Sequence, residues 1–252
     1  MKRLIYLLIV LIIMVSCGEI RVMTYNIHAM RGMDKKLDAK RIAHVINDQN
    51  PDIVALQEVD MFTERSGNMD AIAILEAETG MQGVFMKTFD YQGGEFGNAV
   101  LSKYPIIEQE LIPLPSRPEY EPRLLMRVSV LLDNKDTLNV YNTHLDHHRQ
   151  DSDRPLQMQK IVEIIKHDRR KIMFAGDLNC QPGSDPIDML NKVLTRCSSD
   201  QMTYPADDPY WILDHMYFSE EKGIKDLGLE VIPETVASDH RPVVGRFRIM
   251  AR

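Results

Sequence analysis

The chain of 252 residues is 44% hydrophobic, which suits one well-cored domain or two small ones, and the even spacing of its polar clusters favours one. Its formal net charge of −7 counts against a dedicated binder of long nucleic acid, because such proteins usually carry a basic face. The charge is compatible with local phosphate chemistry, since carboxylates that hold a metal ion contribute to it.

The beginning of the chain has the pattern of an export signal. Met1–Arg3 is a basic start, Leu4–Val15 is an apolar run, and small residues then surround Cys17. The run is too short to cross a bilayer comfortably as a helix. We predict a signal peptide of the bacterial lipoprotein type over residues 1–16, with lipidation of Cys17 and anchoring to the cell envelope on its periplasmic or outer-surface side. Met14 replaces the usual leucine, so ordinary secretion stays an alternative.

The rest of the chain, residues 20–252, is predicted to form a single domain, because no repeat, low-complexity tract or linker divides it. Apolar residues at helical spacing predict helices over Asp38–Asn50 and Asp70–Gly80, and Gly80 would end the second. Short apolar runs predict strands in the same half of the chain at residues 20–26, 53–56, 83–87 and 98–102.

The second half of the chain mixes hairpins with helices. The turn at Asp133–Lys135 would join two of its strands, and helices are predicted at residues 154–166 and 186–194. Strands are predicted at residues 125–132, 138–143, 172–176, 213–218 and 243–249. Interleaved helices together with hairpins favour a mixed α/β sandwich of two sheets with helices outside over a doubly wound parallel sheet.

Several of these strands end at a carboxylate or an amide. Glu58 follows the strand at residues 53–56, and Asp177 and Asn179 follow the strand at residues 172–176. An Asp and an Asn two apart at a strand end face the same side, which suits the activation of a water molecule beside a hard cation. Oxygen ligands without clustered cysteines favour Mg²⁺, with Mn²⁺ as a substitute, over zinc.

The histidines have two interpretations. Three of the eight lie within residues 144–148, but a strand alternates its faces, so they need not converge on zinc, and each could simply make a structural hydrogen bond. His240 stands beside Asp239 near the end of the chain. Asp214, in the preceding strand, could fix the charge of His240 and make it an imidazolium aimed at a phosphate.

Two cysteines remain beyond the export signal. Cys180 and Cys197 could form a disulfide in an exported chain. Cys180 also directly follows a predicted core strand, where a buried free thiol is equally expected, so the sequence leaves both alternatives open.

Seven short motifs carry a family resemblance. They are Met23–His28, Leu56–Val59, Gly97–Ser102, Thr143–Asp146, Gly176–Asn179, Leu213–His215 and Ser238–Pro242. In this order they resemble the endonuclease/exonuclease/phosphatase superfamily, and the resemblance extends over essentially all of residues 20–249. Any one of these motifs alone is weak evidence for the family, whereas seven in this order are specific to it. One departure is His28, where nucleases of the family often carry a carboxylate.

The resemblance implies a four-layer α/β sandwich, of the DNase I type, that hydrolyses phosphoester bonds with a divalent metal, usually Mg²⁺. By this resemblance Asn26, Glu58 and Asp239 would hold the metal. Asp177 would orient or deprotonate the attacking water, and Asn179 would position it.

The same resemblance assigns the phosphate side of the site. His144 and His240, the latter oriented by Asp214, would bind the phosphate and stabilise the charge that builds on its oxygens, in line with the general needs of phosphoryl transfer. Further candidates for phosphate contact are Tyr91, Asn98 and Arg123.

We therefore expect an exported, membrane-anchored Mg²⁺-dependent phosphodiesterase that acts as a monomer on nucleic acid, a phospholipid head group or another organic phosphate. A phosphomonoesterase for a sugar or inositol phosphate is one alternative, and a catalytically idle surface-binding protein is another. Arginines in the two loops expected to flank the site suit either a compact anionic substrate or a solvated rim. We expect Trp211 to pack beneath the sheet rather than to stack on a substrate.

Overall fold

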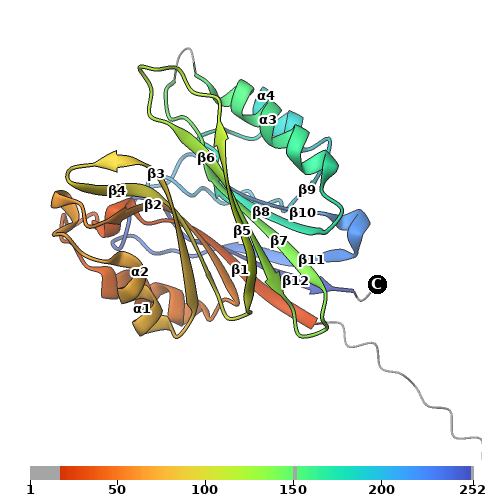
Figure 1. Cartoon of the computed structure of the whole chain (residues 1–252), viewed down its shortest axis with the longest axis horizontal. Coiled ribbons are helices and arrows are strands. Elements are labelled where there is room, and N and C mark those ends of the chain that lie inside the picture. The colour runs from red at the N-terminus through yellow and green to blue at the C-terminus, as the bar shows by residue number, and fades with distance from the viewer. Residues whose placement is uncertain (1–17, 150–151, 251–252) are drawn as a thin grey trace, which may run out of the picture.

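The computed structural model describes residues 18–149 and 152–250, so the predicted signal peptide and Cys17 lie outside the described residues. Two mixed six-stranded sheets pack face to face, and helices cover their outer faces (Figure 1). The predicted four-layer α/β sandwich is confirmed. In the described part of the chain, no helix is both long and apolar enough to cross a membrane.

The first sheet has the strand order β11-β12-β1-β2-β4-β3. Its strands are β1 (Gly18–Asn26), β2 (Ile53–Met61), β3 (Gln82–Tyr91), β4 (Gly94–Ser102), β11 (Ile224–Val231) and β12 (Val243–Ile249). β1 and β2 are parallel, with Asn26 opposite Gln57, and the other neighbours are antiparallel.

The second sheet has the strand order β5-β6-β7-β8-β10-β9. Its strands are β5 (Ile106–Leu114), β6 (Arg123–Leu131), β7 (Thr137–His144), β8 (Lys171–Asp177), β9 (Thr195–Arg196) and β10 (Asp214–Phe218). β7 and β8 are its parallel pair, with His144 opposite Asp177. Each sheet thus contains one parallel pair, and the carboxyl ends of both pairs carry polar residues of the predicted site.

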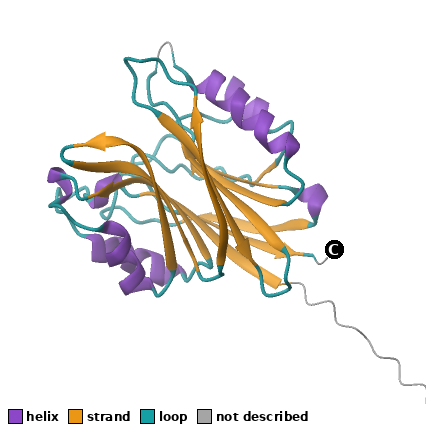
Figure 2. Cartoon of the chain, in the orientation of Figure 1, coloured by secondary structure: helices purple, strands orange, loops and turns teal. Residues whose placement is uncertain are grey.

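Four α-helices and three short 3₁₀ turns complete the described fold (Figure 2). Asp38 and Asp70 cap the first two helices, since each side chain accepts a hydrogen bond from the backbone N–H three residues on. The fourth helix ends at Leu190, whereas the sequence predicted an end at Leu194. The elements are η1 (His28–Met30), α1 (Ala39–Gln49), η2 (Glu64–Ser66), α2 (Ala71–Thr79), α3 (Arg154–His167), α4 (Asp185–Leu190) and η3 (Glu220–Lys222).

Three apolar clusters hold the layers together. The central one lies between the sheets and includes Val22, Val128 and Met173. A second joins the first sheet to α1 and α2, and a third joins the second sheet to α3 and α4. The two cysteines are buried free thiols: Cys180 belongs to the third cluster and Cys197 to the central one.

Candidate active site

A break in the pairing of β2 with β4 positions Glu58. Leu56 pairs with Ala99 and Val59 with Gly97, so two residues of β2 lie opposite Asn98 alone. Glu58 also has a backbone φ of 54°, in the left-handed region that non-glycine residues rarely adopt. Such bulges commonly redirect a side chain beside an active site, and here the redirected group is the carboxylate of Glu58.

The end of β8 positions a second carboxylate. A side chain at Gly176 would collide with the carbonyl oxygen of Thr143, so glycine permits the close approach of β7 to β8 at this point. Asp177 follows and is 1% exposed. The backbone N–H of Asn179 donates to Oδ1 of Asp177 at 2.9 Å, and Nδ2 of Asn179 donates to the carbonyl oxygen of Leu145 at 3.1 Å.

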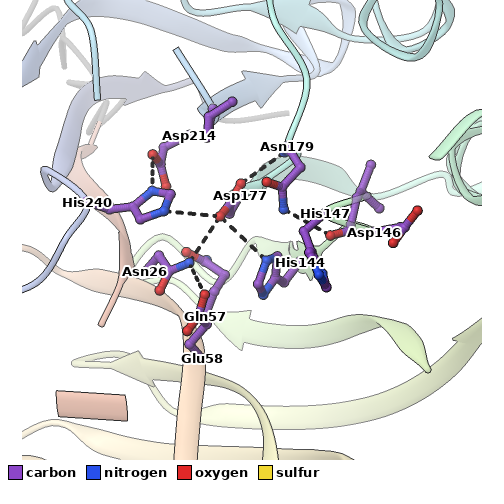
Figure 3. A network of polar contacts seen from close by, with 12 residues as sticks. Asn26, Gln57, Glu58, His144, Asp146, His147, Asp177, Asn179, Asp214 and His240 are labelled. Carbon is purple, nitrogen blue, oxygen red and sulfur yellow. Dashed lines mark hydrogen bonds and ion pairs between the residues drawn. The ribbon is translucent and has the colours of Figure 1, made fainter. Parts of the chain in front are cut away.

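Asp177 lies at the centre of the predicted site (Figure 3). Its Oδ2 accepts a hydrogen bond from Nδ2 of Asn26 at 3.0 Å, and it lies 3.6 Å from Nε2 of both His144 and His240. Nδ2 of Asn26 also donates to Oε1 of Glu58 at 2.9 Å. Groups from β1, β2, β7, β8 and the segment before β12 therefore converge, as the sequence motifs predicted.

His240 is held by a second buried carboxylate. Its Nδ1 lies 2.9 Å from Oδ2 of Asp214, and His240 is 5% exposed. Burial alone would lower the pKa of this imidazole, but the negative charges of Asp214 and Asp177 outweigh it and raise the pKa to about 10. The ring is therefore an imidazolium at neutral pH, with Nε2 facing Asp177.

Burial acts on Asp177 in the opposite sense. Loss of solvation is the largest cause and raises its pKa to about 7, against the lowering effect of the positive His240. A carboxyl group with this pKa can accept a proton near neutral pH, which is what a general base must do. Asp177 is thus suited to accept the proton of an attacking water.

The other histidine of the centre, His144, is neutral. Burial is the main cause that holds its pKa well below the usual value, and the charge of Arg123 adds to the effect. Nη1 of Arg123 lies 3.3 Å from Nδ1 of His144, and because a guanidinium only donates, Nδ1 must accept. The proton of His144 then resides on Nε2, which points into the site as a donor.

Arg123 links several groups at the side of the site. It is 3% exposed, and its Nη2 lies 2.9 Å from Oε2 of Glu121 and 3.0 Å from Nδ1 of His147. Its Nε is buried without a hydrogen-bond partner in the described part of the chain. An unsatisfied donor of this kind can serve an anionic ligand.

The donor set fits a hard divalent cation. Glu58 and Asp239 both line the cavity described below, and Asn26 contacts Glu58. Oδ1 of Asp239 lies 3.6 Å from Nδ1 of His28, a buried nitrogen without a hydrogen-bond partner among the described residues. Carboxylate and amide oxygens of this kind suit Mg²⁺ or Mn²⁺.

A second group of potential ligands overlaps this centre. Candidate ligand atoms of Asp177, Asp214 and His240 all lie within 4.8 Å of one another. A protonated imidazole has no lone pair for a metal ion, and Nδ1 of His240 is already bonded to Asp214. We therefore interpret this group as the charge-holding part of the site.

The centre opens into a cavity of about 380 Å³. The predicted site residues that line it are Glu58, Tyr91, Arg123, His144, Asp177, Asn179, Asp239 and His240. Asn26 and Asp214 lie behind this lining and contact it through Asp177 and His240. Asn98 is 2% exposed in β4 and is not among the residues that line the cavity, so a role for it in phosphate contact stays a prediction.

Two cavity residues differ from the expectation. Arg65 was not anticipated: its guanidinium forms two hydrogen bonds with Asp60, at 2.6 and 2.8 Å, and lies 4.6 Å from the ring centre of Tyr91. The packing predicted for Trp211 is wrong. It is half-buried, lines the cavity and carries the guanidinium of Arg149 over its ring at 4.7 Å.

Comparison with known proteins gives the relatives of this chain. A family model described as "Endonuclease/Exonuclease/phosphatase family" matches residues 23–240. Protein cwh43 of Schizosaccharomyces pombe is 26% identical over 225 residues, which are 86% of this chain, but the chain spans only 21% of that protein. YbhP of Escherichia coli is 24% identical over 246 residues, covering 91% of this chain and 96% of YbhP.

Among solved structures, a mannosyl-6-phosphatase of Bacteroides thetaiotaomicron is similar to this chain with a TM-score of 0.73. It is 17% identical, and the match covers 90% of this chain and 99% of that one. At this identity the likeness concerns the fold alone.

Proposed function

Because the chain belongs to the endonuclease/exonuclease/phosphatase family, we propose that this metal-dependent phosphoester hydrolase acts on a compact phosphodiester. The observation that carries the proposal is the buried carboxylate of Asp177, which lies between the imidazolium of His240 and the neutral ring of His144. Asp177 can therefore act as the base for an attacking water, while His240 and His144 can donate hydrogen bonds to the phosphate oxygens.

The chain's own groups account for most of the reaction. Asp177 accepts a proton from the attacking water while Asn179 positions it, and Nε2 of His240 and of His144 donate to the phosphate oxygens. A Mg²⁺ or Mn²⁺ ion held by Asn26, Glu58 and Asp239 would supply positive charge to the phosphoryl group.

Charge balance favours a diester over a monoester. Four cations line the cavity beside the centre: Arg65, Arg123, Arg149 and His240. Three of them already pair with a carboxylate, and Arg149 lies over the Trp211 ring. A phosphodiester carries one negative charge, whereas a phosphate monoester carries close to two at neutral pH. The limited surplus of positive charge suits the singly charged substrate, and the small cavity suits a compact one.

A panel of esters tests this proposal. The full-length chain in detergent would be assayed with Mg²⁺ and with EDTA on bis-p-nitrophenyl phosphate, p-nitrophenyl phosphate, plasmid DNA and sphingomyelin. We expect metal-dependent turnover of the small diester, lost in Asp177→Asn and kept in Asp208→Asn, an exposed control on a loop. A preference for p-nitrophenyl phosphate would instead support the monoesterase, and no turnover at all would support the surface-binding protein.

We propose that the protein is exported and lipid-anchored at Cys17. The support is the sequence pattern before Cys17, and β1 begins at Gly18, which would place the domain close to the membrane. Labelling with a radioactive fatty acid should mark the wild type and Cys180→Ala but not Cys17→Ala. Equal labelling of both variants would contradict the anchor.

We also propose that the protein acts as a monomer. The inner faces of both sheets pack against each other and helices cover the outer faces, so the fold buries its main apolar surfaces within one chain. Light scattering of the detergent-solubilised chain tests this state.

A further inference from the structure

A second cavity, of about 460 Å³, adjoins the active-site cavity. Five residues are shared by the linings of the two cavities: His147, Arg149, Asn179, Trp211 and Leu213. The two spaces therefore meet beside Asn179 and Trp211. The proposed reaction at Asp177 uses only the first space, and nothing in it so far accounts for the second.

The second cavity has a mainly apolar wall. Pro155, Pro186, Trp211 and Leu213 contribute carbon surface, and Cys180 lies among them as a buried thiol. Apolar lining next to a charged centre is typical of a site that binds the organic part of a ligand while the centre binds its charge. A volume of this size accommodates a ring.

Its place relative to Asn179 decides which organic group it can take. In phosphoryl transfer the leaving oxygen departs from the side opposite the attacking water. Asn179 positions that water together with Asp177, and the second cavity opens beside Asn179. A group in this cavity is therefore not the one expelled.

We propose that the second cavity binds the substituent that stays on the phosphate, and that this substituent is apolar and the size of a ring. The inference rests on the proposed phosphodiesterase activity, because a monoester has no second substituent. It makes the enzyme selective for diesters in which one substituent is a single apolar ring.

Two diesters with the same leaving group test the proposal. Methyl p-nitrophenyl phosphate and cyclohexyl p-nitrophenyl phosphate both release p-nitrophenolate and differ only in the retained group. We expect kcat/KM to be about tenfold higher for the cyclohexyl ester, as burial of a ring in an apolar pocket allows. The full-length chain with Mg²⁺ serves for both assays.

Filling the cavity should abolish the preference. Ser184 lines it at the start of α4, where its side chain makes no capping hydrogen bond, and Gln181 lines it from an exposed position. We expect Ser184→Phe and, independently, Gln181→Trp to lower the ratio to about one while turnover of the methyl ester stays within about twofold. Asp188→Phe adds the same bulk to an exposed position of α4 outside the cavity and should keep the ratio.

The outcomes separate this inference from the proposed function. Turnover of the methyl ester without any preference in the wild type overturns the inference alone. So does a preference that survives in both filling variants, or an equal loss on both esters in both of them. No metal-dependent turnover of either diester overturns the proposed function and the inference with it.

Discussion

Nε2 of Gln57 donates to Oδ1 of Asn142 at 2.8 Å, a hydrogen bond that joins the first sheet to the second beneath the active site. Asn142 in turn donates to the carbonyl oxygens of Leu56 and Ala99, at 2.8 and 2.9 Å. All of these groups are fully buried. Since Gln57 precedes Glu58 and Asn142 lies two residues before His144, this polar contact fixes the metal side of the site relative to the phosphate side.

Replacing Asn142 with leucine should therefore affect both stability and catalysis. The change removes three buried hydrogen bonds, and Nε2 of Gln57 keeps only its contacts with Thr24 and Ala55, so we expect a loss of about 2–4 kcal/mol of unfolding free energy. We expect kcat to fall as well, by about tenfold, because a small displacement of catalytic groups is costly. Asn139→Leu, at the other end of β7, is the control: it should lower the denaturation midpoint but not kcat of the folded enzyme. Equal kcat in the two variants would contradict a positioning role for Asn142.

We expect Asp177→Asn to lower the activity of the enzyme and to raise its stability. Loss of the base should lower kcat by about 10²–10⁴-fold. Because burial raises the pKa of Asp177 to about 7, its ionisation opposes folding, and wild-type stability falls as the pH rises from the unfolded value of about 4 to about 7. In EDTA the variant should therefore melt above the wild type, with a gap that is small at about pH 4 and grows towards pH 7. A gap that shrinks as the pH rises would contradict this assignment.

Much of the site could be predicted from the sequence because its residues lie at strand ends. Apolar strands ending in Glu58, His144 and Asp177 are visible as runs, and the carboxyl ends of parallel strands meet at one edge of each sheet. The bulge that turns Glu58 inward has no such signal. It depends on pairing with β4, which lies some forty positions further along the chain.

Other features depend on tertiary contacts that no local pattern records. Arg65 belongs to the turn η2 and gains its place from Asp60 and the Tyr91 ring. Trp211 lies at the cavity and is joined to Tyr204 by a backbone bridge, whereas we had expected it to pack beneath the sheet. The edge strands β5 and β11 were missed because their residues are mostly exposed or half-buried and give little apolar signal.

The ion pair between His240 and Asp214 should act as one unit in catalysis. We expect His240→Gln to lower kcat/KM by about 10²–10³-fold, since it removes a charged donor to the phosphate. Asp214→Asn should lower it less, because His240 stays in place but loses the carboxylate that holds its proton. The double variant should be no worse than about twofold below His240→Gln. Additive losses in this double-mutant cycle would show that the two residues act separately.

Arg123 should need its guanidinium shape and not only its charge. It contacts Glu121, His144 and His147 in three directions, which a lysine ammonium cannot reproduce at the same distances. We expect Arg123→Lys to lower kcat/KM by about tenfold, mainly through a higher KM. Arg127→Lys, on the same strand and paired with Glu110 at 2.6 Å, should leave the kinetics unchanged. Unchanged kinetics in both variants would remove Arg123 from the substrate site.

Mg²⁺ binding to variants of the candidate ligands would show which residues hold the metal. If Glu58 is a ligand, Mg²⁺ should raise the melting temperature of the wild type, and Glu58→Gln should weaken Mg²⁺ binding by at least about tenfold, because a charged oxygen donor becomes neutral. Glu64→Gln, an exposed change on η2, should bind Mg²⁺ as the wild type does.

Asp214→Asn separates the two potential sites in the same titration. We expect it to retain the Mg²⁺-induced shift, because Asp214 holds the proton of His240 rather than the metal. A shift that survives in Glu58→Gln and disappears in Asp214→Asn would place the metal at the group formed by Asp177, Asp214 and His240. His240 would then have to be deprotonated on metal binding, and that binding would release a proton detectable in weakly buffered solution.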